Sequence, residues 1–330
     1  MIEIKQNLSL VKMTLESFLS FIKKAAEDFN KIDKNEHIRI ISNYDSDGLT
    51  AASLLVKALK KQDRIFSVRI IKQLTKKILN ETSLEPYNIF IFADLGSTNI
   101  EFFNDTLKSK KIYILDHHQL KSDSPLNNGF FINPLIFDID GSKEVSAAGV
   151  AYLFTKSIDP SNEENSYISI VGAIGDSQEN NGFIGVNNLI LEDAKKYNVD
   201  VKNGLRMFGT YSRPVHKILQ YSTDPYIPGI TGDEQAAIAL LEELGINFYS
   251  NGKWKKLYEL TEQEIQRLTT ALIMKLSNSY PQNIFGPIYI IKNEPEDSII
   301  KDLKEFSTLI NCCGRLNRSS VAIGICLNDK

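Results

Sequence analysis

The chain has 330 residues, of which 42% are hydrophobic and 24% charged, with a formal net charge of −3 at pH 7. This length suits two domains with a core each, and no overall basicity points to nucleic acid, although a local groove of Lys and Arg could still bind phosphates. Three cysteines, two of them adjacent, fit neither a disulfide framework nor a zinc site, and no apolar run reaches the roughly 20 residues that span a bilayer. We expect a cytoplasmic protein with no membrane partner.

The first half of the chain is predicted to alternate between helices and strands. An amphipathic helix over 10–29 precedes an apolar strand at 38–41, and a helix over 48–61 follows. The elements predicted next are a strand at 65–71, a helix around 74–81, a strand ending at Asp94, a helix over 98–107 and a strand ending at Asp116. This alternation predicts an α/β fold with a doubly wound, largely parallel sheet.

Three of these strands end at acidic or histidine side chains. In chain order these side chains are Asp45, Asp47, Asp94, Asp116, His117 and His118. Because the carboxyl ends of parallel strands meet at one edge of a sheet, where ligands bind, we expect the six side chains to converge. Carboxylates and imidazoles that converge in this way predict a metal site.

Beyond Asp116 the sequence predicts one more acidic position. A short strand within 129–140 turns at Asn133-Pro134. A helix over 146–157 then opens with small residues, which allow its backbone to come close to either a neighbouring strand or a ligand. A further helix over 164–174 leads to Asp176.

The composition changes near residue 180, where Gly, Pro and Tyr become frequent and no catalytic pattern is present. Helices are predicted at 234–243 and 261–278, and the last fifty residues are predicted as a strand at 285–292, a helix at 297–312 and a strand at 320–327. We therefore divide the chain into a metal-binding domain (1–195), a helical and loop insert or linker (196–283) and a smaller C-terminal α/β domain (284–330), with a joint at 280–285.

The acidic motifs, in this order along an α/β chain, resemble those of the DHH phosphoesterase superfamily. The segment 305–325 is similar to the companion substrate-binding domain, called DHHA1, and most similar to the archaeal RecJ-like nucleases that associate with the GINS replication complex. The resemblance covers 36–180 and 285–327. Because relatives continue beyond the last predicted strand, we expect the chain to be truncated at its C-terminus.

The resemblance implies a phosphodiesterase site with two divalent ions, Mn²⁺ preferred and Mg²⁺ as the alternative. The implied metal ligands are Asp45, Asp47, Asp94, His117 and Asp176, with Asp94 bridging the two ions. His118 would contact the scissile phosphate and Asp116 would orient the histidine pair. Two divalent ions about 3.5–4 Å apart activate the attacking water and stabilise the leaving oxygen in such reactions.

The sequence departs from the family pattern at two places. Asn43 stands where relatives commonly have Asp or His, and a neutral amide is a weaker metal ligand. The Gly-Gly-Gly-His pattern of many relatives is replaced near Cys313 by Cys-Gly-Arg. The implied substrate-binding residues are His118, Asn311, Gly314, Arg315 and Arg318, because an arginine can bind a phosphate with two hydrogen bonds.

Each of these residues also has a simpler structural interpretation. The alternatives are helix-capping acids for Asp45 and Asp47, turn residues for His117 and His118, an acid that follows a helix for Asp176, and a solvated helix terminus for Arg315 and Arg318. We interpret Trp254 and the tyrosine-rich segment 210–226 as core or interface residues in preference to base-stacking platforms. The lysines Lys60, Lys61, Lys72, Lys76 and Lys77 are interpreted as a solvated face in preference to a strand path.

We therefore expect a RecJ-like exonuclease of archaeal type that hydrolyses single-stranded DNA or RNA from an end, in DNA replication or repair. One alternative is a phosphodiesterase for oligoribonucleotides or cyclic dinucleotides, which would stall on longer strands. Another is a weakly active or inactive replication-fork scaffold that binds GINS, for which Asn43 is the one indication.

Overall fold

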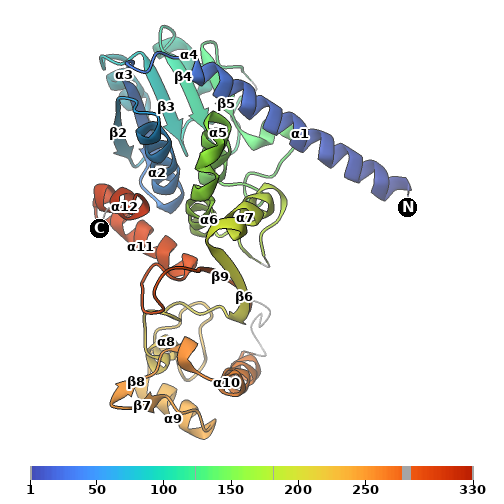
Figure 1. The fold of residues 1–330 in the computed structure, drawn as a ribbon, viewed down its shortest axis with the longest axis vertical. Coiled ribbons are helices and arrows are strands. Elements are labelled where there is room, and N and C mark those ends of the chain that lie inside the picture. The colour runs from blue at the N-terminus through green and yellow to red at the C-terminus, as the bar shows by residue number, and fades with distance from the viewer. Residues whose placement is uncertain (1, 123, 181, 277–283, 329–330) are drawn as a thin grey trace. The chain divides into compact units, whose positions relative to one another are not determined.

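Five parallel strands form the sheet that carries the candidate site in the computed structural model, which describes residues 2–122, 124–180, 182–276 and 284–328 (Figure 1). The strands are β1 (Ile38–Asn43), β2 (Phe66–Ile71), β3 (Ile89–Ala93), β4 (Lys111–Leu115) and β5 (Gly129–Ile132), and their order is β2-β1-β3-β4-β5. In the register of the central strands, Ile41 pairs with Phe92 and Phe92 with Ile114. The predicted α/β fold with a parallel sheet is confirmed.

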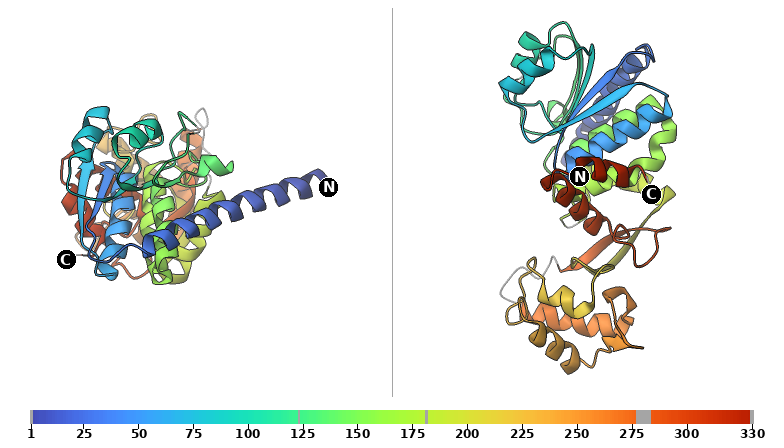
Figure 2. Two further views of the ribbon diagram at one scale, coloured as in Figure 1. Left: turned by 90° about the horizontal axis from the view of Figure 1, so that it is seen from above. Right: turned by 90° about the vertical axis from the view of Figure 1, so that its left-hand side faces the viewer.

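Helices cover both faces of this sheet, so the central strands are buried and apolar on both sides. On one face lie α3 (Lys76–Ser83) and α4 (Ile100–Thr106), whose side chains share a core with the sheet. The other face carries α1 (Ile2–Asn30), α2 (Ser46–Lys61) and α5 (Ala147–Ile158). Helix α6 (Ser166–Gly175) packs on α2 and α5, and α7 (Gly185–Tyr197) packs on α6. Helices α2 and α5 pack side by side, as Figure 2 shows.

The chain divides into two compact units that we describe separately. The first consists of Met1–Glu179, Phe183–Tyr197 and Ser307–Lys330, and the second of Asn180–Gly182 and Asn198–Phe306. The predicted domain 284–330 is therefore split between the two units, and most of the predicted insert 196–283 lies in the second unit. The predicted joint at 280–285 falls partly on residues 277–283, which lie outside the described residues.

The second unit has its own small core. An antiparallel pair is formed by β6 (Val199–Leu205) and β9 (Phe285–Ile291), and a hairpin by β7 (Tyr249–Ser250) and β8 (Lys253–Trp254). Side chains of α8 (Val215–Gln220), α9 (Glu234–Glu243) and α10 (Glu262–Lys275) form the core, with Leu219, Leu241 and Leu268 fully buried. A short 3-10 helix at Leu257–Glu259 also belongs to this unit, whereas two others, Pro134–Phe137 and Pro160–Asn165, lie in the first unit.

Two elements near the C-terminus differ from the prediction. The strand predicted at 320–327 is a helix, α12 (Ser319–Cys326), whose buried residues Ala322 and Cys326 are four positions apart, and the helix packs on α2. This packing outweighs the preference of Val321 and Ile323 for strands. The helix predicted at 297–312 is α11 (Leu303–Arg315). Asp302 accepts hydrogen bonds from the backbone N–H groups of Lys304 (2.7 Å) and Glu305 (3.2 Å), as a helix-capping residue does.

A matched pair of glycines tests how α11 is seated in the first unit. A Cβ at Gly314 would lie 1.7 Å from the backbone oxygen of Tyr44, whereas a Cβ at Gly324 in α12 would meet nothing within 4 Å. We expect Gly314→Ala to destabilise the protein by about 1–3 kcal/mol or more through overpacking. Gly324→Ala should instead stabilise it by about 0.5–1 kcal/mol through helix propensity. Urea unfolding of both variants checks this, and equal effects of the two changes would contradict it.

Candidate metal centre

The turn between β1 and α2 places the first two carboxylates. Asp45 caps α2 by accepting a hydrogen bond from the N–H of Gly48 at 3.0 Å. Any side chain at position 48 would collide with Asn43, since a Cβ there would lie 2.6 Å from the backbone oxygen of Asn43. The tight turn therefore requires glycine, and it directs Asp47, which is buried, toward the carboxyl edge of the sheet.

The first turn of α5 binds the carboxylate of Asp47. The backbone N–H groups of Ala147 and Ala148 donate hydrogen bonds to its two oxygens at 2.7 and 2.9 Å. A Cβ at Gly172 of α6 would lie 2.7 Å from the same carboxylate. The small residues predicted at the start of this helix thus allow a close approach to an acidic side chain. The helix N-terminus favours that negative charge.

Asp94 follows β3 in an unusual backbone conformation. Its φ is 58°, in the left-handed region that Asp adopts more readily than most residues, while its N–H still donates to the carbonyl of Leu115 at 2.9 Å. The chain therefore turns sharply at the end of the strand and the carboxyl group is 98% buried at the sheet edge. Its Oδ1 atom has no hydrogen-bond partner among the described residues.

Asp116 holds the turn that follows β4. One of its oxygens accepts hydrogen bonds from the N–H and the hydroxyl of Ser97 at 2.8 and 2.7 Å. The other accepts from the N–H of His117 at 2.8 Å, from the N–H of His118 at 3.3 Å and from Nδ1 of His118 at 2.8 Å. Burial alone would raise the pKa of Asp116, but these hydrogen bonds and the two imidazoles lower it below its usual value. With both oxygens engaged, Asp116 orients its neighbours.

His117 points one ring nitrogen at three carboxylates. Its Nδ1 donates to the carbonyl of Gly141 at 2.7 Å, which leaves Nε2 facing the acidic group. Nε2 lies 3.2 Å from Oδ2 of Asp176, 3.5 Å from Oδ1 of Asp94 and 3.6 Å from Oδ2 of Asp47. Like the Oδ1 atom of Asp94, this buried nitrogen has no hydrogen-bond partner in the described part of the chain. Ligand histidines in metal sites commonly have their second nitrogen fixed in this way.

The pKa values reflect how closely these charges are packed. Burial raises the pKa of Asp47, Asp94 and Asp176, and the charge of Asp47 adds to the effect at the other two, so that the pKa of Asp176 is about 7. Burial would lower the pKa of His117, but the surrounding carboxylates raise it well above its usual value. A positive charge at this position is therefore strongly favoured, whether it is carried by an imidazolium or by a metal ion.

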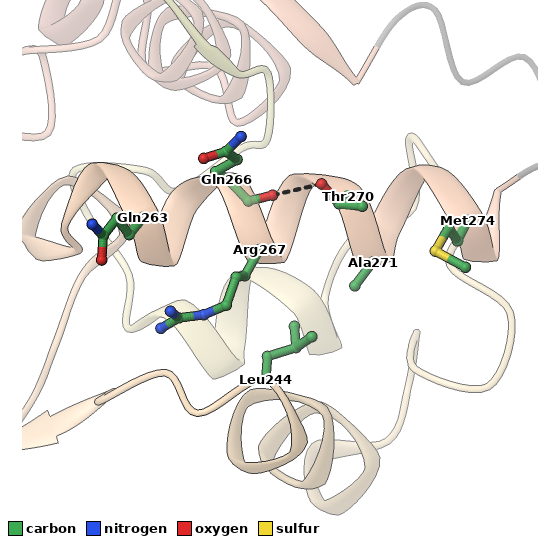
Figure 3. A pocket seen from close by; sticks show the side chains of 7 residues that line it. All are labelled: Leu244, Gln263, Gln266, Arg267, Thr270, Ala271 and Met274. Atoms are coloured by element: carbon green, nitrogen blue, oxygen red, sulfur yellow. Dashed lines mark hydrogen bonds between the residues drawn. The ribbon is translucent and has the colours of Figure 1, made fainter.

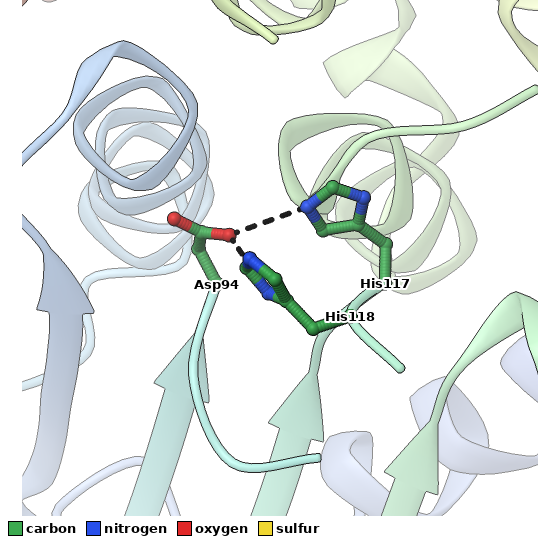
Figure 4. A group of neighbouring side chains, drawn as sticks. All are labelled: Asp94, His117 and His118. Atoms are coloured by element: carbon green, nitrogen blue, oxygen red, sulfur yellow. Dashed lines mark ion pairs between the residues drawn. The ribbon is translucent and has the colours of Figure 1, made fainter. Parts of the chain in front are cut away.

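Two groups of side chains are placed to hold a metal. They are Asp94, His117 and His118, drawn in Figure 4, and Asp47, His117 and Asp176, and in each the ligand atoms lie within 4.8 Å of one another. The residues of the first group follow the ends of β3 and β4. In the second group, Asp47 lies in the first turn of α2, His117 follows β4, and Asp176 follows the end of α6. Oxygen and imidazole ligands of this kind suit Mn²⁺ or Mg²⁺ better than soft metals.

Asp45 lies outside both groups. Besides capping α2, Asp45 accepts a hydrogen bond from the side-chain amide of Asn43 at 3.1 Å. The side-chain oxygen of Asn43 accepts a hydrogen bond from the N–H of Tyr44 at 2.7 Å. In this structure Asn43 therefore supports the turn, and both of its polar atoms are used there.

Several residues that hold the two histidines in place were not predicted from the sequence. The carbonyl of Gly141 also accepts a hydrogen bond from Gln178 (3.0 Å), which is bound in turn by Asn187 (2.6 Å). The amide of Asn133 donates to the Ser97 hydroxyl at 2.8 Å and to the His118 carbonyl at 2.9 Å. Two positions could have been found, because Asn133 directly follows β5 and Gln178 stands two residues after Asp176.

The C-terminal residues predicted to bind substrate belong to α11 and the turn after it. Gly314 packs against the backbone of Tyr44, and Ser307 forms a hydrogen bond with Ser46 at 2.9 Å. This end of α11 therefore lies beside the β1–α2 turn. Asn311 is half-buried, and Arg315 and Arg318 are exposed.

A hollow of about 340 Å³ adjoins the metal-binding groups. Asp94, Asp116 and His118 form one side, and the other lining residues are Asn43, Lys72, Gln73, Leu74, Leu95, Gly96, Ser97, Thr98 and Asn99. Lys72 is the cationic residue among them. A larger hollow of about 640 Å³ in the second unit is lined by Leu244, Gln263, Gln266, Arg267, Thr270, Ala271 and Met274 of α10 and its surroundings (Figure 3). It has no acid or histidine in its lining, so it offers no comparable metal ligands.

Two family models match this chain, one over the domain that carries the sheet and one within the second unit. The DHH family, N-terminal domain, matches residues 37–173, and the DHH-CID domain matches residues 207–284. The uncharacterized protein MJ0831 of Methanocaldococcus jannaschii is 32% identical in an alignment of 302 residues that covers 89% of this chain, and the chain spans 64% of the length of that relative.

Solved structures show the same fold. Exonuclease RecJ bound to manganese matches 94% of this chain and 61% of its own, with 17% identity and a TM-score of 0.53. CDC45 from Entamoeba histolytica matches 96% of this chain and 68% of its own, with 11% identity and a TM-score of 0.67. None of the described helices is long and apolar enough to cross a membrane. With both family domains matched in order, and with the RecJ-like fold around the acidic sheet edge, the chain belongs to the DHH family.

Proposed function

We propose that this protein is a metal-dependent phosphodiesterase that releases nucleotides from an end of single-stranded DNA or RNA. The observation that carries the proposal is the unpartnered Nε2 of His117, buried among the carboxylates of Asp47, Asp94 and Asp176 beside an open hollow. Such a centre can bind divalent cations, which polarise a phosphate and lower the pKa of water when bound. We further propose two ions, with Mn²⁺ preferred over Mg²⁺.

Each residue of the centre has a distinct proposed role. By resemblance Asp94 would bridge the two ions, while Asp47 and Asp176 would hold one of them together with His117, the residue that the two candidate groups share. Asp45 is proposed as a further ligand that would have to release its cap of α2. The Oδ1 atom of Asp94 is buried without a hydrogen-bond partner in the described residues, which supports the proposal that Asp94 is a metal ligand.

His118 is proposed to bind the scissile phosphate. Its side chain is 54% exposed and it lines the hollow. The hydrogen bond to Asp116 raises the pKa of His118 to about 9, so the ring is cationic at neutral pH while no metal is bound. With Nδ1 donating to Asp116, the Nε2–H group is free to donate to a phosphate oxygen. Arg315, Arg318, Asn311 and Gly314 remain proposed substrate contacts by resemblance to the archaeal nucleases, as does a GINS-type complex as partner.

A phosphodiesterase for short oligoribonucleotides or cyclic dinucleotides is the second candidate. The hollow of about 340 Å³ is at the lower end of the range of small-ligand pockets, which favours a short substrate. A replication scaffold needs no intact metal centre, so the preserved acidic groups favour an enzyme over that alternative.

Metal binding should be visible in thermal unfolding. At a Mn²⁺ concentration 100-fold above Kd, one site adds about 2.7 kcal/mol to the free energy of unfolding. We expect Asp94→Asn to abolish most of this gain without lowering stability in chelator, because it removes a buried charge and Asn tolerates the left-handed backbone. Asp138→Asn is the matched control, since Asp138 also has a positive φ (55°) but is exposed. A full Mn²⁺ shift in Asp94→Asn would refute the assignment of this carboxylate.

Hydrolysis can be followed on gels with single-stranded DNA and RNA oligonucleotides labelled at either end. We expect release of mononucleotides with Mn²⁺, less with Mg²⁺ and none with chelator, and loss of activity in Asp94→Ala. The labelled end that disappears first gives the polarity. Rapid turnover of dinucleotides with stalling on longer strands would favour the second candidate, and intact substrates of every length would rule out both enzymes.

Lys72 is expected to bind a phosphate of the substrate in the hollow. A hydrogen bond to a charged group contributes about 1.5–3 kcal/mol, so Lys72→Ala should lower kcat/KM about tenfold or more, mainly through KM. Lys77→Ala in the neighbouring helix α3 is the control, because this exposed lysine does not line the hollow. Equal kinetics for the two variants would show that Lys72 is only a solvated surface residue.

A further inference from the structure

The hairpin of β7 and β8 in the second unit has a turn whose sequence favours its conformation. In this hairpin, Tyr249 pairs with Trp254 and Ser250 with Lys253. The two turn residues between the strands are Asn251 (φ 53°) and Gly252 (φ 77°). Positive φ at both central positions is what a type I′ turn requires, and Asn-Gly is its preferred sequence. The hairpin therefore holds the rings of Tyr249 and Trp254 on one face, opposite each other.

The Trp254 ring is supported from within but open to solvent. It lies 4.3 Å from the ring of buried His216 and 5.8 Å from that of Phe248, nearly parallel to the latter, and Tyr249 meets it edge-on at 5.0 Å. Even so, Trp254 is 44% exposed and Tyr249 51% exposed. Trp254 is therefore not a core residue, and of the two predicted roles only that of an interface residue remains. Large rings fixed by neighbours and left exposed are typical of recognition surfaces.

Three lysines lie close to these rings in the sequence. Lys253, Lys255 and Lys256 lie within residues 249–256, where the sequence YSNGKWKK has no acidic residue. In the described part of the chain, none of the three forms an ion pair with a carboxylate, and the same is true of Arg213, next to the Pro214 that bridges to Lys256.

The acidic groups near the hairpin already have partners. Glu234 binds Lys217 at 2.6 Å, and Glu259 accepts the backbone N–H of Lys256 at 2.6 Å. The pKa of Glu264 is raised by burial but lowered more by hydrogen bonds from Thr261 and Asn247 and by the charge of Lys255, although Lys255 and Glu264 form no ion pair. The hairpin thus offers exposed rings together with lysines that form no ion pair in the described residues. An apolar partner would leave the lysines without counter-charges, and an acidic peptide would leave the rings unused. Single-stranded nucleic acid uses both, because its bases stack on aromatic rings and its phosphates bind lysines.

We propose that the hairpin 249–256 is a stacking site for single-stranded nucleic acid. A base stacks on Trp254 or Tyr249, and the flanking phosphates bind Lys253, Lys255 and Lys256. This inference rests on the proposed function for the class of ligand, but it requires no hydrolysis. Such a site makes affinity rise with strand length, which separates an enzyme for long strands from one for dinucleotides.

The sequence supplies a site-specific probe, because Trp254 is its only tryptophan. Titration of the full chain, in chelator and low salt, with 15-nucleotide oligo(dT) and oligo(U) should quench the tryptophan emission saturably. A duplex of the same length should not quench it, because its bases are already stacked. Binding of labelled oligonucleotide, followed by anisotropy, should weaken about 5- to 100-fold in Trp254→Leu. Tyr226→Leu, which removes a 60% exposed ring outside the hairpin, should leave it unchanged.

A charge variant keeps the test independent of packing around Trp254. Lys255→Ala with Lys256→Ala should reduce the slope of log affinity against log salt by about 1.4, which is roughly 0.7 per phosphate contact on a single strand. Lys275 is an exposed lysine of α10, and Lys275→Ala should reduce this slope less than the double variant does.

The outcomes separate this inference from the proposed function. Oligonucleotide binding seen by anisotropy without any change in tryptophan emission would overturn the stacking site, even if hydrolysis occurs. Quenching by polyglutamate but not by oligonucleotide would also overturn it and identify a surface for acidic proteins. Saturable quenching by single strands in a protein that hydrolyses nothing would support the stacking site and refute only the enzyme.

Discussion

The concentration of buried negative charge around one imidazole nitrogen is the constraint that the first unit is built to meet. Desolvated carboxylates a few ångströms apart cost several kcal/mol each unless hydrogen bonds or cations compensate them. The fold provides part of this compensation through backbone groups: the start of α5 binds Asp47, and the carbonyl of Gly141 fixes His117. The remainder is left open at Nε2 of His117 and at Oδ1 of Asp94, where a cation is the natural partner.

This arrangement depends on backbones that approach side chains closely. At Gly48, Gly141 and Gly172 an added Cβ would lie within 2.7 Å of a neighbouring atom. Glycine at such positions loses more conformational freedom on folding than any other residue. These glycines therefore lower the stability of the first unit, but they let its backbone approach the side chains of the centre closely. The large apolar core of β3 and its neighbours offsets that loss of stability.

The sequence was sufficient for the strand-end residues because a parallel sheet brings its carboxyl ends together whatever the intervening lengths. Gly141 escaped prediction for a different reason: it acts through its backbone carbonyl, which has no signature in the side-chain sequence. The small residues at the start of α5 did predict a close approach of the backbone, but not that Asp47 would be its partner. Asp45 shows the limit of residue type alone, since an acid before a helix can serve as cap or as ligand. The helix α12 escaped because its β-branched residues suggest a strand, and only its packing on α2 explains a helix.

Electrostatics also limits how such a protein can hold a polyanion. The chain has a net charge of −3 and the centre itself is acidic, so long-range attraction cannot supply the affinity for nucleic acid. In the proposed function, favourable charge would then be local: bound cations and His118 at the centre, Lys72 in the hollow, and the lysines of the hairpin in the second unit. Stacking is nearly independent of salt, whereas phosphate contacts are not, so a strand held largely by rings would stay bound at ionic strengths that remove the lysine contribution.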